Sequence, residues 1–130
     1  MPVELTELSS NAIMLTVRGR LTEAELSEAQ RAGTKAMASM DRVRIVVIVE
    51  DFEGWQKGAE WNDMSFQMEN DSKIERMALV GDRKWKELVL AFVGEGLREF
   101  PIEYFAHGQM AEARAWALAS SLLGVQITSR

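Results

Sequence analysis

Four carboxylates follow an apolar run near the middle of the chain, at Asp51, Glu53, Glu60 and Asp63. Carboxylates grouped in this way can hold a hard cation, or they can work as an acid and base pair. Their spacing does not match the calcium-binding loop, and the single histidine, His107, cannot supply a set of nitrogen ligands for a transition metal. The pattern favours solvated charges and a helix cap, so we expect no metal site and no cofactor.

The motif Gly81-Asp82-Arg83-Lys84 lies between a predicted strand and a predicted helix. Backbone N–H groups at such a place, together with Arg83 and Lys84, could contact an anion or a lipid head group. The spacing matches neither a phosphate-binding loop nor the G-x-G-x-x-G pattern. A helix cap by Asp82 is enough to explain the motif, and the anion contact is the weaker alternative.

Covalent catalysis has little support in the composition. The chain has no cysteine and one histidine, which excludes cysteine nucleophiles, thiolate metal sites and a two-histidine metal site within one chain. The nucleophile elbow G-x-S-x-G is absent as well. His107, next to Gly108, fits a turn or a cap better than a catalytic base. We therefore expect a protein that is not an enzyme.

The segment 55–69 is rich in aromatic side chains and methionine. Trp61, Met64 and Met68 have the spacing of one helix face, and Phe66 lies away from that face. Core packing is the favoured interpretation for the first three, whereas Trp55 and Phe66 are expected to be exposed or to face a ligand. Methionine adapts to varied ligand shapes, and tryptophan suits a boundary between apolar and polar surroundings.

These residues predict a movable helix at about 55–69 that covers an apolar groove. Gly54 and Gly58 lie on its leading side and are candidate hinges. Phe52 and Trp85 complete the set of residues expected to contact the ligand.

The length and the net charge of the chain exclude several other classes of function. The chain has 130 residues, which is one domain, 1–130, with room for a sizeable core. Its net charge of −5 argues against non-specific binding of nucleic acid, which needs a basic face. The acidic start, 1–7, lacks the features of a signal peptide, and no apolar run is long enough to span a bilayer. A cytoplasmic location is expected.

Periodicity and turn residues predict the elements that position these residues. Ala12 to Arg18 alternates as a half-buried strand, Thr22 and Glu25 form a capping box, and the unalternating run Val43 to Val49 suits a central buried strand. The expected strands are 3–8, 12–18, 43–49, 74–80 and 102–105, and the expected helices are 22–39, 59–69, 82–93 and 110–123. The order β-β-α-β-α-β-α-β-α predicts an α/β domain with an opening hairpin and a mostly parallel sheet of about five strands.

This order is similar to that of STAS domains, and the motifs resemble the SpoIIAA-like family of small bacterial STAS-domain proteins. The resemblance rests on "DFEGW" at 51–55, "WND" at 61–63, "VGDRKW" at 80–85 and "EARAW" at 112–116. It implies the STAS-like fold over nearly the whole chain. It also implies a relationship to CRAL-TRIO domains, which carry lipids and other apolar ligands.

One departure from the family pattern bears on regulation. Antagonists of the SpoIIAA type carry a phosphorylatable serine at the start of the helix after the central strand. Here the corresponding stretch, 50–58, has neither serine nor threonine, and Ser65 is the first hydroxyl downstream. A kinase-controlled switch of that kind is therefore not expected.

The leading expectation is a non-enzymatic module that binds a small apolar or lipid-like ligand. The helix at 55–69 would act as its lid or touch a membrane surface, peripheral to the inner membrane, by apolar insertion more than by charge. The alternative is a regulatory protein–protein module of the anti-sigma-factor-antagonist type. A homodimer is a further expectation, because exposed apolar helices often pair across a two-fold axis.

Overall fold

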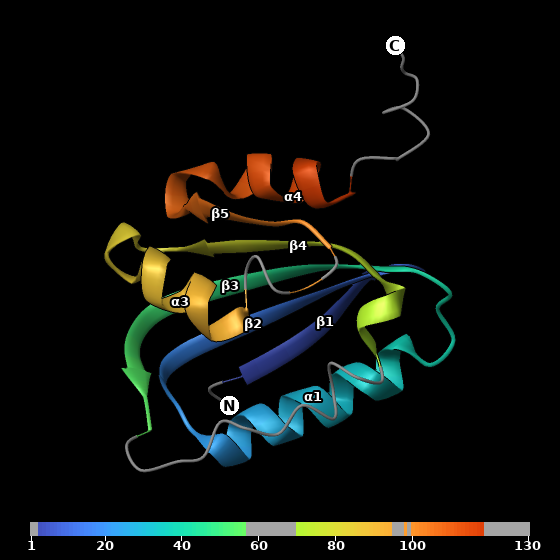
Figure 1. Ribbon diagram of the computed structural model, residues 1–130, viewed down its shortest axis with the longest axis horizontal. Helices are drawn as coiled ribbons and strands as arrows, with labels where there is room; N and C mark the ends of the chain where they lie inside the picture. The colour runs from blue at the N-terminus through green and yellow to red at the C-terminus, as the bar shows by residue number, and fades with distance from the viewer. Residues whose placement is uncertain (1–2, 57–69, 95–97, 99, 119–130) are drawn as a thin grey trace.

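The computed structural model describes residues 3–56, 70–94, 98 and 100–118 (Figure 1). Five strands form one sheet in chain order, β1 (Val3–Ser9), β2 (Ala12–Leu21), β3 (Val43–Trp55), β4 (Ile74–Gly81) and β5 (Ile102–Ala106). The described helices are α1 (Glu23–Met37), α3 (Lys86–Val93) and α4 (Met110–Leu118), with short 3-10 turns η1 (Asp71–Lys73), η2 (Arg83–Trp85) and η3 (His107–Gln109). The β1–β2 pair is antiparallel and the other three pairs are parallel, which confirms the predicted fold class.

The two faces of the sheet are covered by different helices. Ile13, Ile45 and Leu79 are buried with Met37 of α1 and Val89 of α3. The opposite face packs on the small residues of α4. That second core consists of Val46, Ile48, Ala78, Val80, Ala113 and Ala117. Figure 1 shows α1 and α4 on opposite sides of the molecule, with the sheet between them.

Helix α1 begins as its sequence predicts. The Thr22 hydroxyl accepts the N–H of Glu25 at 3.1 Å, and the Glu25 carboxylate accepts the N–H of Thr22 at 2.9 Å. This reciprocal pair satisfies two backbone N–H groups that the first turn leaves free. The capping box fixes where the chain leaves β2 and enters the helix.

The expected end of the central strand at Val49 is wrong, because β3 continues to Trp55. Its pairing with β2 shifts register twice, between Arg18 and Gly19 and between Gly19 and Arg20. Left-handed backbone at Asp51 (φ 46°) and Gly54 (φ 102°) accompanies these shifts. Such bulges add a residue to one strand and bend it. Strand β2 likewise passes through Gly19 and ends at Leu21.

The helix expected after Asp82 is shorter and less regular than predicted. The turn η2 comes first, α3 follows, and Gly94 ends it in the left-handed conformation (φ 79°). Leu88 is 55% exposed. The inward face consists of Val89, Phe92 and Val93. The predicted helix at 59–69 and the predicted continuation of the last helix to Leu123 lie outside the described residues.

Candidate functional site

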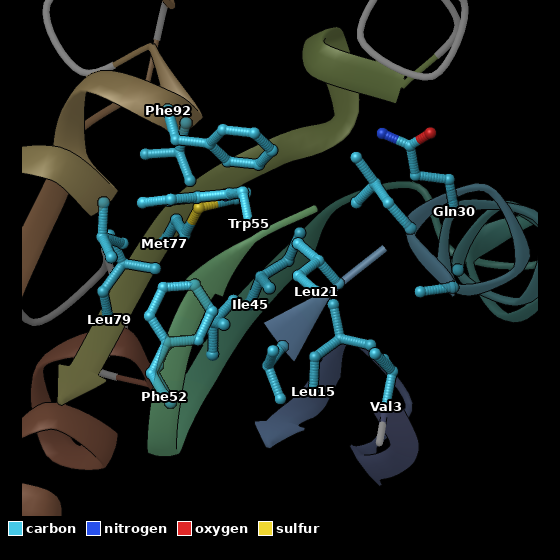
Figure 2. A pocket seen from close by; sticks show the side chains of 18 of the residues that line it. Val3, Leu15, Leu21, Gln30, Ile45, Phe52, Trp55, Met77, Leu79 and Phe92 are labelled. Atoms are coloured by element: carbon cyan, nitrogen blue, oxygen red, sulfur yellow. The ribbon is translucent and has the colours of Figure 1, made fainter. Parts of the chain in front are cut away.

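An apolar cavity of about 250 Å³ lies between the sheet and helices α1 and α3 (Figure 2). Its floor is the face of the sheet that turns away from α4. The strand residues that line the cavity are Val3, Ile13, Leu15, Val17, Leu21, Ile45, Val47, Val49, Phe52, Trp55, Met77 and Leu79. Leu15 and Val47 are only half-buried although they lie within the sheet. Their remaining exposure is consistent with the unfilled space beside them.

The alternation of the strands produces this floor. Ile13, Leu15 and Val17 of β2 pair with Ile45, Val47 and Val49 of β3, position for position. Alternate residues of a strand lie on the same face, so these pairs form one apolar surface. The two helices supply the walls, with Leu26, Ala29, Gln30 and Gly33 from α1 and Val89, Phe92 and Val93 from α3.

An aromatic cluster closes the end of the cavity at the carboxyl end of β3. The Trp55 ring lies 5.0 Å from Phe52 and 5.1 Å from Phe92, between ring centroids. Trp85 packs edge-on against Phe52 at 4.9 Å and against Trp55 at 6.0 Å. These spacings and orientations are those of favourable aromatic pairs. Figure 2 shows Trp55, Phe92 and Met77 grouped together, with Gln30 across from them on α1.

The bulges in β3 aim two of these side chains at the cavity. Strict alternation from Val49 would direct residues 51, 53 and 55 to this face. The register shift at Asp51 brings Phe52 there instead, and the second shift, at Gly54, restores Trp55 to it. Two irregular backbone positions thus direct both aromatic rings at the ligand space.

Arg98 and Gln30 are the polar side chains among the described residues that line the cavity. The Arg98 guanidinium is 8% exposed and forms a two-pronged ion pair with Asp71, with Nε 2.9 Å from Oδ2. It also donates to the carbonyl of Val93 at 3.1 Å and lies over the Phe100 ring. Its charge is therefore balanced by a neighbouring carboxylate and its donors are engaged.

One buried polar atom of a cavity-lining residue has no such partner. The Nε1 atom of Trp55 is buried, and no hydrogen-bond acceptor reaches it within the part of the chain that the structure describes. A buried indole N–H usually finds an acceptor. Leaving this donor unsatisfied carries a desolvation penalty.

A second hollow, of about 140 Å³, lies between β1 and α1. It shares Val3, Leu15 and Ala29 with the main cavity, so the two spaces adjoin. Glu25 and Glu28 are the charged residues among its described lining. This side of the site is therefore acidic.

The structure places only part of the predicted ligand set at the cavity. Phe52 and Trp55 line it, whereas Trp85 lies behind them in the aromatic cluster. Gly54, expected as a hinge, is a buried residue inside β3 and pairs with Arg20 in the sheet. The other predicted members, Trp61, Met64, Phe66, Met68 and the hinge Gly58, lie outside the described residues.

The candidate anion contacts, Arg83 and Lys84, are exposed on η2. Asp82 accepts the N–H of Lys84 at 3.0 Å, which confirms its predicted role as a cap. The Lys84 ammonium lies 5.9 Å from the Trp85 ring centroid. Neither residue is among the described lining of the cavity.

His107 makes a contact that joins two elements of the fold. His107 Nε2 lies 2.9 Å from the carbonyl oxygen of Val49, so the ring ties η3 to β3. No cluster of His, Asp or Glu suited to a metal ion occurs among the described residues.

Several cavity residues escaped the sequence analysis. Phe92, Arg98 and the small residues of α1 carry no motif, because each resembles an ordinary core or surface position. Only the pairing of distant strands and helices brings them together. The one available signal was the small-residue face of α1, at Ala29 and Gly33, which leaves space above the sheet.

Comparison with known proteins identifies the family. A family model described as SpoIIAA-like matches residues 12–118. The chain belongs to the SpoIIAA-like family. A search of curated proteins gives no match.

A solved structure supports the same fold for this SpoIIAA-like protein. An uncharacterised protein of the DUF3478 family from Shewanella loihica PV-4, described as having a SpoIIAA-like fold, superposes with a TM-score of 0.67. The two sequences are 14% identical over 88% of this chain and 91% of the other. Within its described residues, this SpoIIAA-like chain has no helix long and apolar enough to cross a membrane.

Proposed function

We propose that this SpoIIAA-like protein is a non-enzymatic binding module that takes a small apolar or lipid-like ligand in the cavity beneath α1 and α3. The observation that carries the proposal is the cavity itself, about 250 Å³ of space lined almost wholly by apolar side chains. An apolar space of this kind accepts apolar molecules, because their entry removes apolar surface from water.

The volume limits the size of what can be enclosed. A dry cavity of about 150 Å³ holds benzene, so this one would hold roughly ten carbon and oxygen atoms. That is the size of a short acyl chain or an alkylbenzene. A whole diacyl lipid would leave most of its length outside.

The chemistry of the lining favours binding over reaction. Among the described residues it has two polar side chains, Gln30 and Arg98, and the second is held by Asp71. A reaction centre needs a nucleophile or a base within hydrogen-bond reach of the substrate. The described lining instead supplies apolar surface, and covering this surface with an apolar molecule makes binding favourable.

The test is a titration of the full chain with n-propylbenzene, followed by calorimetry and by backbone amide NMR. We expect saturable binding, with shifts at residues of β2, β3 and α3. The variant Val47→Phe fills the cavity from the central strand and should abolish binding. Thr6→Phe makes a similar change at an exposed position on β1 and should leave the affinity unchanged.

Absence of saturable binding to the wild-type chain would refute the proposal, as would equal affinity in the Val47→Phe variant. A stoichiometric protein partner captured by the wild-type chain and by Val47→Phe alike, in a chain that binds no propylbenzene, would instead favour the regulatory protein–protein module.

A further inference from the structure

We infer that the ligand of the cavity is an unbranched chain with an uncharged polar end, and that this end lies in the hollow between β1 and α1. The inference rests on the proposed function and names the class of its ligand. Two observations carry it, the meeting of two apolar spaces beneath α1 and the charges at the outer one.

The main cavity extends across the sheet toward the hollow. Its lining runs from Leu79 on β4 to Val3 on β1, about 14 Å across four strands that lie about 4.8 Å apart. Val3, Leu15 and Ala29 line the cavity and the hollow alike. Figure 2 shows Val3 and Leu15 on the side of the cavity away from Phe92. A chain too long for the cavity would therefore pass these shared side chains and enter the hollow.

Helix α1 is anchored to the core at its C-terminal end, where Met37 is fully buried. Leu26 and Ala29, in the first half of the helix, are half-buried and line the cavity instead. Ala29 is the residue of α1 that lines both spaces, and its methyl group is a small obstacle to a chain. The first half of α1 thus covers the place where the two spaces meet.

The hollow is bordered by exposed residues and carries two carboxylates. Glu28 and Ala32, which line it, are exposed. The Glu25 carboxylate is held there by the capping box, in which it accepts the N–H of Thr22. An anionic end group would meet repulsion from these carboxylates and find no cation among the described lining. An alcohol or amide end group avoids this repulsion.

The experiment measures the affinity of the wild-type chain for two alcohols, 3-phenylpropan-1-ol and 6-phenylhexan-1-ol, by calorimetry. The shorter alcohol matches the main cavity, which has room for roughly ten carbon and oxygen atoms, and the longer one needs the hollow as well. Its three further methylenes should raise the affinity about sixty-fold, which is roughly four-fold for each buried methylene. An advantage below about four-fold would overturn the inference, because it would leave the added chain unburied.

Ala32→Phe fills the hollow and spares the main cavity, because Ala32 lines only the first of these two spaces. The variant should bind the shorter alcohol as the wild-type chain does and lose the advantage of the longer one. Ala24→Phe is the matched control, since Ala24 is exposed on the same helix and lines neither space. It should leave both affinities unchanged. An advantage of the longer alcohol that survives in Ala32→Phe would contradict passage into the hollow.

Backbone amide NMR of the wild-type chain gives a readout that does not depend on a variant. The longer alcohol should shift the signals of Leu5 and Ala32, which line the hollow, whereas the shorter one should shift them little. Both alcohols should shift Val89 in the wall of the main cavity. A longer alcohol that binds and shifts no residue of the hollow would overturn the inference.

The anion 6-phenylhexanoate tests the end group, because it has the same chain with a carboxylate in place of the alcohol carbon. At neutral pH it should bind about five-fold more weakly than 6-phenylhexan-1-ol, and the difference should shrink in Glu28→Gln and in about 1 M salt. Equal affinities at neutral pH would refute the uncharged end group. A wild-type chain that does not bind n-propylbenzene would refute the proposed function, whereas one that binds it without preferring the longer alcohol refutes only this inference.

Discussion

Asp51 and Gly54 hold backbone conformations that most residues avoid, and the position of the aromatic cluster depends on them. Asp51 has a φ of 46° and Gly54 a φ of 102°. Asp tolerates the left-handed region because its short side chain can bond locally, whereas the second value is accessible mainly to glycine. A Cβ at Gly54 would lie 3.6 Å from the Trp85 ring, which is ordinary contact, so conformation and not space requires glycine there.

Gly54→Ala should therefore lower the free energy of unfolding by about 1–3 kcal/mol, through backbone strain alone. Chemical denaturation monitored by circular dichroism measures this loss. Gly108→Ala is the control, because its added methyl group meets open space and no positive φ is involved. Equal stability of the two variants would show that the strain at Gly54 is small.

Tyr104 makes the free energy of unfolding depend on pH in the alkaline range. Its hydroxyl donates to the Asp82 carbonyl oxygen at 2.8 Å. Burial raises the pKa of the Tyr104 phenol above its ordinary value of about 10, and the Asp82 carboxylate adds to the effect. The folded state therefore holds the phenol proton more tightly than the unfolded state. The contribution of the protonated phenol to the free energy of unfolding is complete below about pH 10 and is lost as the pH rises further.

Tyr104→Phe should flatten the fall in unfolding free energy between about pH 9 and about pH 12 relative to the wild-type chain. At neutral pH the variant should lose about 1 kcal/mol with the hydrogen bond. Urea denaturation of both proteins across this range gives the comparison. Parallel pH profiles would assign the alkaline loss to other groups.

At the level of elements, helix α4 packs through alanine. Ala113 and Ala117 are fully buried against Val46, Ile48 and Ala78 of the sheet. Small side chains let a helix approach a sheet closely, and tight packing leaves no room for added methylenes. Arg76 reinforces the contact by donating to the carbonyl of Trp116 at 2.6 Å.

Ala117→Leu should lower the free energy of unfolding by about 1–3 kcal/mol by overpacking this contact. Ala115→Leu, on the exposed side of the same helix, should change it by about 0.5 kcal/mol or less. Thermal denaturation of the two variants separates packing from helix propensity, because both substitutions have the same propensity change. Equal losses of unfolding free energy in the two variants would contradict the assignment of Ala117 to the buried face of α4.

Elements that depend on residues close together in the sequence were predicted, and those that depend on distant residues were not. Alternation at 12–18 and the capping box at Thr22 depend on neighbouring residues, so the hairpin and the start of α1 were predicted. The extension of β3 was not, because Phe52 and Trp55 are three residues apart, a spacing that matches no regular strand. The register shift between Phe52 and Gly54 creates that spacing, and it becomes visible only in the pairing with β2.

The apolar nature of the candidate site was predicted from the sequence, but only some of the residues that line it were. An apolar ligand site with Phe52 and Trp55 could be expected from the local excess of aromatic residues. Its floor could not, since Leu15 and Val47 look like core residues until the space above them is seen. The charge of Arg98 is balanced by Asp71, which is distant in the sequence, so this ion pair could not be predicted either.

Taken as a whole molecule, the sheet separates a tightly packed side from a hollow one. On the α4 face, buried valine and isoleucine side chains of the sheet pack against the alanines of α4, and the α1–α3 face contains the cavity of about 250 Å³. A ligand that fills this space stabilises the entire folded chain by mass action, because the unfolded chain has no such cavity.

At about one hundred times its dissociation constant, n-propylbenzene should add about 2.7 kcal/mol to the free energy of unfolding of the wild-type chain. The midpoint of thermal unfolding should rise by several degrees with it. Val47→Phe, whose side chain occupies the same space, should show no rise. An unchanged midpoint in the wild-type chain would show that the folded chain does not bind the ligand.

The order of the strands has a consequence for how the chain acquires its shape. Each strand pairs with the one that precedes it in the sequence, from β1 to β5. Three of the four pairs are parallel, and each of these closes a crossover connection instead of a tight turn, so they form more slowly than the opening hairpin. During synthesis the sheet can extend one strand at a time from its N-terminal edge, with no strand waiting for a partner made later. The α4 face stays uncovered until α4 emerges, so the apolar residues there are the part of the nascent chain most exposed to aggregation.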